Sequence, residues 1–188
     1  ATDGDTIFTT LDYTIQQYAE QAVADSMAQW PSENVASLVM NPNTGEIYAM
    51  ASANKFDLND PDEPLALSDE AFTEGWNAMT DEDKSAYLNN MWRNFCLSDA
   101  FEPGSVYKPL VVAAALEEGV ITKNSTFYCG GSITVADRKI GCHLKSGHGT
   151  VTVEDIMARS CNPGIIQIAQ KLGPEKLYKY QREFGFGQ

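Results

Sequence analysis

The first half of the chain changes from a helical to a strand-like pattern of apolar residues. Between residues 12 and 29 apolar side chains recur every three to four positions, and Thr10 or Asp12 can cap the helix that this spacing predicts. Two apolar runs, residues 35–40 and 46–52, flank a polar Asn-Pro-Asn-Thr-Gly turn. We expect these runs to pair as a β-hairpin.

The remainder of the chain is mostly helical in its pattern. Residues 53–80 are rich in polar and turn-forming residues and predict a loop region, and the glycine-rich residues 120–150 predict irregular structure. The spacing of apolar side chains predicts further helices at residues 81–93, 105–118, 152–159, 165–172 and 175–184. The pattern therefore predicts a helix, a hairpin and then a series of helices.

Composition narrows the function classes. The 188 residues carry 13 basic and 26 acidic side chains, a formal net charge of −13, and no basic run that could neutralise phosphates, so we expect no nucleic-acid partner. No run of 18 apolar residues is present, so the sequence predicts no membrane-spanning helix in these residues. Four cysteines in a chain of this length are too few for a disulfide scaffold.

Ser105 and Lys108 are the candidate catalytic pair. A serine hydroxyl needs a nearby base to act as a nucleophile, and residues three apart at the start of a helix share one face. Lysine can serve as that base when burial in an apolar helix favours its neutral form. On its own an S-x-x-K pattern is common, and a capping serine followed by a surface lysine is its ordinary explanation.

The residues around this pair resemble a known family. The segment Glu102–Pro109 (EPGSVYKP) closely resembles the EPGSxxKP nucleophile segment of class B penicillin-binding proteins. The hairpin sequence NPNTGEIYAMAS, the helix that opens at Thr9-Thr-Leu-Asp12, the Gly-His-Gly at 147–149 and Ser160-Cys-Asn162 also resemble that family, in the same order. The resemblance extends over residues 7–187.

The resemblance implies an α+β transpeptidase fold like that of the serine β-lactamases, with an antiparallel sheet flanked by helices. We expect residues 1–188 to be one transpeptidase domain, truncated at its C-terminus. In that domain residues 53–100 form a loop-rich and helical insertion, and residues 105–188 form a helical part that carries the first two motifs. The rest of the domain would then be a partner of this chain.

The resemblance also implies D,D-transpeptidation of peptidoglycan stem peptides ending in D-Ala-D-Ala. Ser105 is expected to attack the penultimate D-alanine carbonyl and Lys108 to act as general base. Ser160 is expected to relay protons, and Asn162 to hydrogen-bond the substrate amide. β-Lactams would acylate Ser105. The parent protein is expected to be membrane-anchored at the extracytoplasmic face of a bacterial cell membrane.

Two alternatives stay open. One is a serine β-lactamase or D,D-carboxypeptidase, against which the class B character of the matching segments argues. The other is a non-catalytic, β-lactam-sensing module of the same fold. The third motif of the family, K-[ST]-G, has no match after Asn162, and we interpret the earlier string Lys145-Ser-Gly147 as a coincidence. The chain alone is therefore expected to be inactive.

Cysteines and histidines cluster between residues 129 and 148. Cys129, Cys142 and His148 are candidate ligands of a structural zinc ion, with His143 or Asp137 as a further ligand, and catalysis is expected to need no cofactor. A Cys129–Cys142 disulfide and unlinked thiols remain alternatives to zinc. Cys161 is expected to border the cleft, and Cys96 to be a small core residue.

Overall fold

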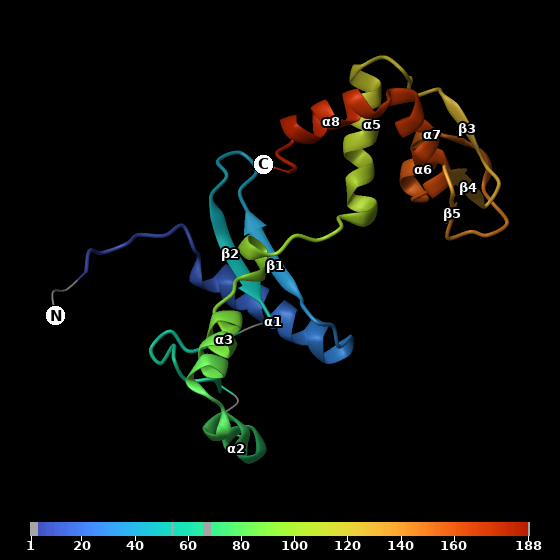
Figure 1. Ribbon diagram of the computed structural model, residues 1–188. Coiled ribbons are helices and arrows are strands. Elements are labelled where there is room, and N and C mark those ends of the chain that lie inside the picture. Colours follow the sequence, from blue (N-terminus) through green and yellow to red (C-terminus); the bar gives the residue numbers. More distant parts are fainter. Residues whose placement is uncertain (1–3, 54, 66–68, 188) are drawn as a thin grey trace. The chain divides into compact units, whose positions relative to one another are not determined.

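The computed structural model describes residues 4–53, 55–65 and 69–187 (Figure 1). The chain forms two compact units: unit 1, residues 1–100, and unit 2, residues 101–188. The assignment of the whole chain to a single domain stays a prediction. Within the described residues, no helix has the length and apolar character that a membrane span requires.

Helix α1 (Tyr13–Gln29) opens unit 1 where the sequence pattern predicts it. Asp12 caps the helix, because its carboxylate accepts a hydrogen bond of 2.9 Å from the amide of Ile15. The helix lies across the hairpin of unit 1 (Figure 1). Small side chains that are more than nine-tenths buried make this contact: Ala19, Val23, Ala49 and Ala51.

The predicted hairpin is also present. Strands β1 (Ala36–Met40) and β2 (Ile47–Ser52) pair antiparallel, with a register irregularity between Val39 and Met40. Gly45 has a φ of +78° in the connecting turn, a conformation that glycine adopts without strain. The hairpin and α1 form one small apolar core.

Among its described residues, unit 1 has the further α-helices α2 (Glu70–Ala78), α3 (Asp81–Met91) and α4 (Phe95–Ser98). Helix α3 confirms the predicted helix, but α2 lies in the segment 53–80, for which a loop was predicted. Asp69 caps α2, and Phe72 and Trp76 contact Tyr87 of α3. The contacts with α3 stabilise α2, and the local spacing of apolar residues does not show them.

Unit 2 is built mainly from helices, as predicted. A single 3-10 turn, η2 (Gly104–Tyr107), leads into α5 (Lys108–Glu117), and three more helices follow the strands: α6 (Val153–Ala158), α7 (Asn162–Leu172) and α8 (Pro174–Glu183). Thr152 and Asp155 form a capping box at the start of α6, with Asp155 replacing the usual Glu or Gln.

Residues 120–150 are not irregular, contrary to the prediction. Strand β3 (Thr126–Cys129) pairs antiparallel with β6 (Gly149–Thr152), and β4 (Ser132–Val135) pairs antiparallel with β5 (Arg138–Gly141). Each strand has only four residues, which is too short for an alternating pattern to stand out. Pairing between segments far apart in the chain stabilises β3 and β6.

The main core of unit 2 lies between α5, α6, α7 and the β3–β6 pair. Ile156 and Ile168 are fully buried in it. Gly164 lets α7 pass close to α6, because a Cβ at this position would lie 2.5 Å from Cγ1 of Ile156 and would force that side chain to shift. Helix α8 is tied to the end of α5 by Glu118, which forms an ion pair of 2.8 Å with Lys176. Helices α5 and α7 also pack directly against each other in this core.

Candidate functional site

Ser105 and Lys108 lie one turn apart at the junction between η2 and α5. Gly104 has a φ of +59°, which allows the chain to turn sharply before the serine. The amide of Lys108 donates to the carbonyl of Ser105, so both side chains lie on one face, as predicted. In this chain the Ser105 side chain is exposed, whereas Lys108 is only 7% exposed.

The Lys108 amine is surrounded by three oxygen atoms. Its Nζ lies 2.9 Å from the carbonyl oxygen of Ser160, 2.7 Å from the Ser160 hydroxyl and 2.8 Å from Oδ1 of Asn162. These residues are more than 50 positions away in the chain. The structure thus brings together the two motifs that the sequence predicted to share a site.

Ser160 bridges the lysine and the nucleophile. Its hydroxyl lies 3.0 Å from the hydroxyl of Ser105. Ser160 has a φ of +48°, a left-handed conformation that is uncommon for a residue other than glycine. Asn162 is oriented by a second contact, because its Nδ2 donates to the carbonyl of Gly141 at 2.9 Å and its Oδ1 is left to face Lys108.

The surroundings of Lys108 favour its neutral form. Burial lowers the pKa of Lys108 below its ordinary value, and negative charge on the neighbouring Cys161 or Cys142 would act in the opposite direction. Its three hydrogen-bond partners are neutral oxygens, and two of them, the carbonyl of Ser160 and Oδ1 of Asn162, can only accept. The Ser160 hydroxyl can also donate. A neutral amine can therefore take a proton from Ser160, and Ser160 can take one from Ser105.

The string Lys145-Ser146-Gly147 lies in the turn that precedes β6 and not on a strand. Gly147 has a structural role there. A Cβ at this position would lie 2.3 Å from the carbonyl oxygen of Cys129, so only glycine allows the two segments to approach. The presence of glycine in this string is therefore explained by backbone packing, independently of catalysis.

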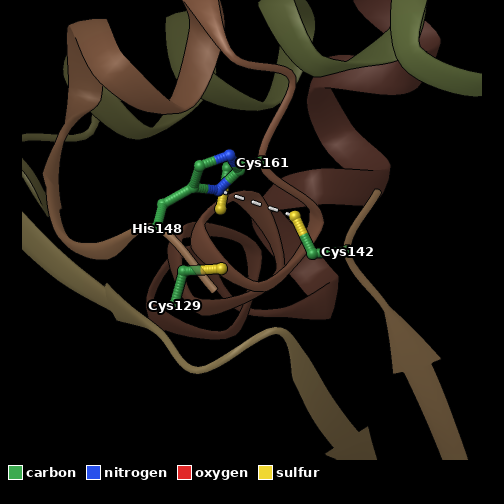
Figure 2. Close-up of side chains that lie close together, drawn as sticks. All are labelled: Cys129, Cys142, His148 and Cys161. Carbon is green, nitrogen blue, oxygen red and sulfur yellow. Dashed lines mark hydrogen bonds between the residues drawn. The ribbon is translucent and has the colours of Figure 1, made fainter. Parts of the chain in front are cut away.

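Three cysteines and one histidine meet beside this site (Figure 2). The thiols of Cys129, Cys142 and Cys161 and a ring nitrogen of His148 all lie within 4.8 Å of one another. Cys129 ends β3, Cys142 follows β5, His148 precedes β6 and Cys161 precedes α7. We name these four residues the cysteine cluster. Of the predicted ligands, Cys129, Cys142 and His148 belong to it.

The fourth residue of the cysteine cluster is not one of the predicted ligands. His143 is exposed and its Nδ1 lies 3.9 Å from Cys142 Sγ, but it is not part of the group, and neither is Asp137 in the turn between β4 and β5, among the residues that the structure describes. Cys161 takes this place and is fully buried, so its thiol faces the cluster. The signal available in the sequence was a third cysteine in unit 2, after Cys129 and Cys142.

The four cysteines are free thiols in the structure. Cys96 is only partly buried, which corrects its assignment as a core residue. Burial would raise the pKa of Cys129, but hydrogen bonds from the backbone of His148 and Gly131 outweigh this and lower it. Burial raises the pKa of Cys161. Cys129 is therefore the more acidic thiol of this pair.

Comparison with known proteins identifies the family. Residues 35–188 match the penicillin-binding protein transpeptidase domain. The chain belongs to this family. The fold agrees, because the transpeptidase domain of a peptidoglycan glycosyltransferase from Eggerthella lenta superposes with a TM-score of 0.72, at 28% identity, over 95% of this chain and 37% of that chain. The α+β transpeptidase fold expected from the sequence is thereby confirmed.

Several named penicillin-binding proteins are similar over nearly the whole chain. Stage V sporulation protein D of Bacillus subtilis is 33% identical over 99% of this chain, and the peptidoglycan D,D-transpeptidase MrdA of Escherichia coli is 30% identical over 98%. A solved structure, Pseudomonas aeruginosa PBP2 in complex with WCK 5153, superposes with a TM-score of 0.71 at 29% identity, over 95% of this chain and 36% of that one. The chain spans about a quarter of the length of these two curated relatives, 26% of each.

Proposed function

We propose that this chain carries the nucleophile of a peptidoglycan D,D-transpeptidase. The observation that carries the proposal is the path of short contacts from Ser105 through Ser160 to the buried Lys108. Such a path lets a serine hydroxyl lose its proton to a neutral amine as it attacks a carbonyl. The name of the E. coli relative, a peptidoglycan D,D-transpeptidase, supports the substrate class.

The proposed reaction has two steps. Ser105 Oγ forms a bond to the carbonyl carbon of the penultimate D-alanine of a stem peptide ending in D-Ala-D-Ala, and its proton passes through Ser160 to Lys108. The peptide C–N bond then breaks, and the terminal D-alanine leaves with a proton returned from Lys108. In the second step an amine of a neighbouring strand forms a C–N bond to the ester carbonyl carbon, the bond from that carbon to Ser105 Oγ breaks, and the proton of the amine passes through Lys108 and Ser160 to Ser105 Oγ.

The other assigned residues have distinct parts in this proposal. Asn162 holds Lys108 through Oδ1 and is itself held by Gly141. Movement of this amide toward a bound peptide would allow it to hydrogen-bond the substrate as well. β-Lactams would acylate Ser105 in place of the D-alanine carbonyl, in agreement with the β-lactam complex of the Mycobacterium tuberculosis relative that is named with ampicillin.

The proposed setting follows from the substrate. Peptidoglycan lies outside the bacterial cell membrane, so this part of the protein is proposed to act on the extracytoplasmic face, within a membrane-anchored parent protein. The K-[ST]-G motif of the family would be supplied by the remainder of the transpeptidase domain. Catalysis is proposed to need Ser105, Lys108, Ser160 and Asn162 and no cofactor.

A labelled penicillin tests the proposal on the full-length protein that carries this chain. We expect one covalent adduct, located at Ser105 by mass spectrometry of the labelled peptide, and its loss in Ser105→Ala. Ser146→Ala is the matched control, because it removes a hydroxyl from the Lys145-Ser146-Gly147 string. Absence of an adduct at Ser105 would favour the non-catalytic, β-lactam-sensing alternative.

The enzyme alternatives differ in the fate of the acyl group on Ser105. A transpeptidase releases D-alanine faster when an acceptor amine is present and retains the penicillin adduct. A D,D-carboxypeptidase would release D-alanine equally fast without an acceptor, and a β-lactamase would hydrolyse the adduct and turn penicillin over. Either of these outcomes would replace the transpeptidase assignment.

A further inference from the structure

The β4–β5 hairpin carries basic side chains in a strongly acidic chain (Figure 1). Residues 120–150 hold four basic residues and one acidic residue, whereas the whole chain has 13 basic and 26 acidic residues. Two of these basic residues, Arg138 and Lys139, begin β5, and Lys145 lies in the turn that precedes β6. This segment is therefore positively charged within a chain whose formal net charge is −13.

The basic side chains of this segment are available to a ligand. Arg138, Lys139 and Lys145 are exposed, and none of them forms an ion pair with a residue that the structure describes. By contrast, Arg159 at the end of α6 is paired with Asp155 at 3.2 Å. All four residues of β5 are exposed, and successive side chains of a strand point to opposite faces. Unit 2 therefore leaves both faces of this strand open.

The end of β5 lies at the candidate site. The Nδ2 of Asn162 donates to the carbonyl of Gly141, the last residue of β5, at 2.9 Å, and Oδ1 of the same side chain lies 2.8 Å from Lys108 Nζ. At about 3.4 Å per residue, Lys139 and Arg138 lie roughly 7 Å and 10 Å from Gly141 along the strand. The two cations are therefore close to the nucleophile but are not part of its proton path.

The hairpin backbone is held at both of its ends. At the tip, Val135 pairs with Arg138 across a two-residue turn, in which Ala136 has a φ of +53°, a left-handed conformation that is uncommon for a residue other than glycine. At the base, Gly131 lies so close to the carbonyl oxygen of Lys145 that a Cβ would collide with it. A backbone that is fixed in this way preorganises the charges for a ligand.

We propose that Arg138 and Lys139 bind a carboxylate of the stem peptide, two or three residues before the reacting D-alanine. This rests on the proposed function, in which Asn162 hydrogen-bonds the peptide. A peptide that continues past Asn162 in an extended conformation advances about 3.4 Å per residue. Its second or third residue from the reacting carbonyl therefore reaches the part of β5 that carries the cations. A guanidinium group can hold a carboxylate there through two parallel hydrogen bonds.

The two cations act on the choice of substrate. A positive strand in a chain of net charge −13 attracts an acidic peptide to this side of the site, whereas the acidic remainder of the chain repels it. Arg138 and Lys139 are therefore specificity-determining residues. They favour a peptide that carries a carboxylate over the same peptide with an amide in its place.

Two series of peptides test the proposal on the full-length protein that carries this chain. All end in D-Ala-D-Ala. One series has glutamate two or three residues before the reacting D-alanine, and the other has glutamine at the same position. Binding is measured by fluorescence anisotropy in the Ser105→Ala background, so that no peptide is consumed. We expect the glutamate peptide to bind roughly 2-fold to 30-fold more tightly at one of the two positions, as two exposed ion pairs allow.

Matched variants assign the preference to the hairpin. Arg138→Gln combined with Lys139→Gln should lower the affinity for the glutamate peptide to that of the glutamine peptide. Lys171→Gln is the control, because it removes an exposed positive charge from the last turn of α7, and it should retain the preference. High salt should reduce the preference, since exposed charges are screened. No preference at either position, or the same preference in the double variant, would overturn the proposal.

Release of D-alanine separates this proposal from the proposed function. With Ser105 in place, kcat/KM for release should show the same preference for glutamate as binding does. If the glutamate peptide binds more tightly but neither peptide releases D-alanine and no penicillin adduct forms, the proposed function has failed and the hairpin remains a binding site. If D-alanine is released equally well from both peptides, the proposed function stands and the roles of Arg138 and Lys139 are overturned.

Discussion

Changing Asn162 to aspartate tests whether neutral Lys108 is the base. The substitution puts a negative charge where Oδ1 now lies 2.8 Å from the amine. At a separation of about 4 Å between charge centres and an effective dielectric constant of about 20, two opposite charges attract by about 4 kcal/mol. That attraction corresponds to about 3 pKa units.

The burial of the new carboxylate opposes part of this effect, so we expect Asn162→Asp to raise the pKa of Lys108 by about 1–3 units. Burial lowers this pKa in the unmodified protein. The substitution leaves in place the neighbouring cysteines Cys161 and Cys142, whose negative charge would raise this pKa. At a pH below the pKa of Lys108 the neutral fraction falls tenfold per unit, so acylation there should slow by roughly 10-fold to 1000-fold.

The assay is the rate of Ser105 acylation by a fluorescent penicillin as a function of pH, in the full-length protein. The rate of the unmodified protein should rise with pH through the lowered pKa of Lys108, and the curve of Asn162→Asp should move to higher pH. Asn162→Ala is the control, since it removes the same contacts without adding charge and should lower the rate without that upward shift. Identical pH profiles for both variants would refute a neutral Lys108 as base.

Three further predictions concern the stability of unit 2 and can be checked by urea or thermal unfolding of the 188-residue chain. Gly164→Ala should cost about 1–3 kcal/mol, because the new methyl group would collide with Ile156, and an unchanged midpoint would contradict the packing described for α7. Thr152→Ala should cost about 0.5–2 kcal/mol through loss of the cap of α6, and no loss would mean that the capping box is dispensable. The ion pair with Lys176 and other hydrogen bonds lower the pKa of Glu118 to about 2, so its contribution is complete above about pH 4.5 and is lost as the pH falls toward 2. Glu118→Gln should remove this acid-dependent step from the unfolding profile, and a step of the same size in the variant would assign it to another group.

Helices α1, α3 and α5 to α8 and the hairpin could be predicted from the sequence because their determinants are local, whereas α2 could not. Asp12 caps α1, and the Thr152–Asp155 pair starts α6, from within one turn of the element that each begins. The β3–β6 pair could not be predicted in this way. Its partners, such as Phe127 and Val151, are separated by 24 positions, and each becomes a strand through pairing with the other.

The candidate site likewise has residues that could be predicted from the sequence and one whose surroundings could not. Ser105, Lys108, Ser160 and Asn162 were found through ordered motifs, and the structure brings them within hydrogen-bonding distance. Cys161 was assigned to the wrong surroundings. Its position between two motif residues suggested a side chain facing the cleft, but neighbours in a turn can point in opposite directions. Only the fold shows that its sulfur faces the cysteine cluster.

The left-handed backbone of Ser160 has a consequence for how this position can change under selection. An L-amino acid loses roughly 1–2 kcal/mol of folding free energy in this conformation, whereas achiral glycine does not. Ser160→Gly would therefore relieve the strain and remove the hydroxyl. A library selected for thermal stability should therefore enrich glycine at position 160, and one selected for penicillin acylation should return serine. If the proposed proton path holds, the chain retains a less stable residue at this position for its chemistry.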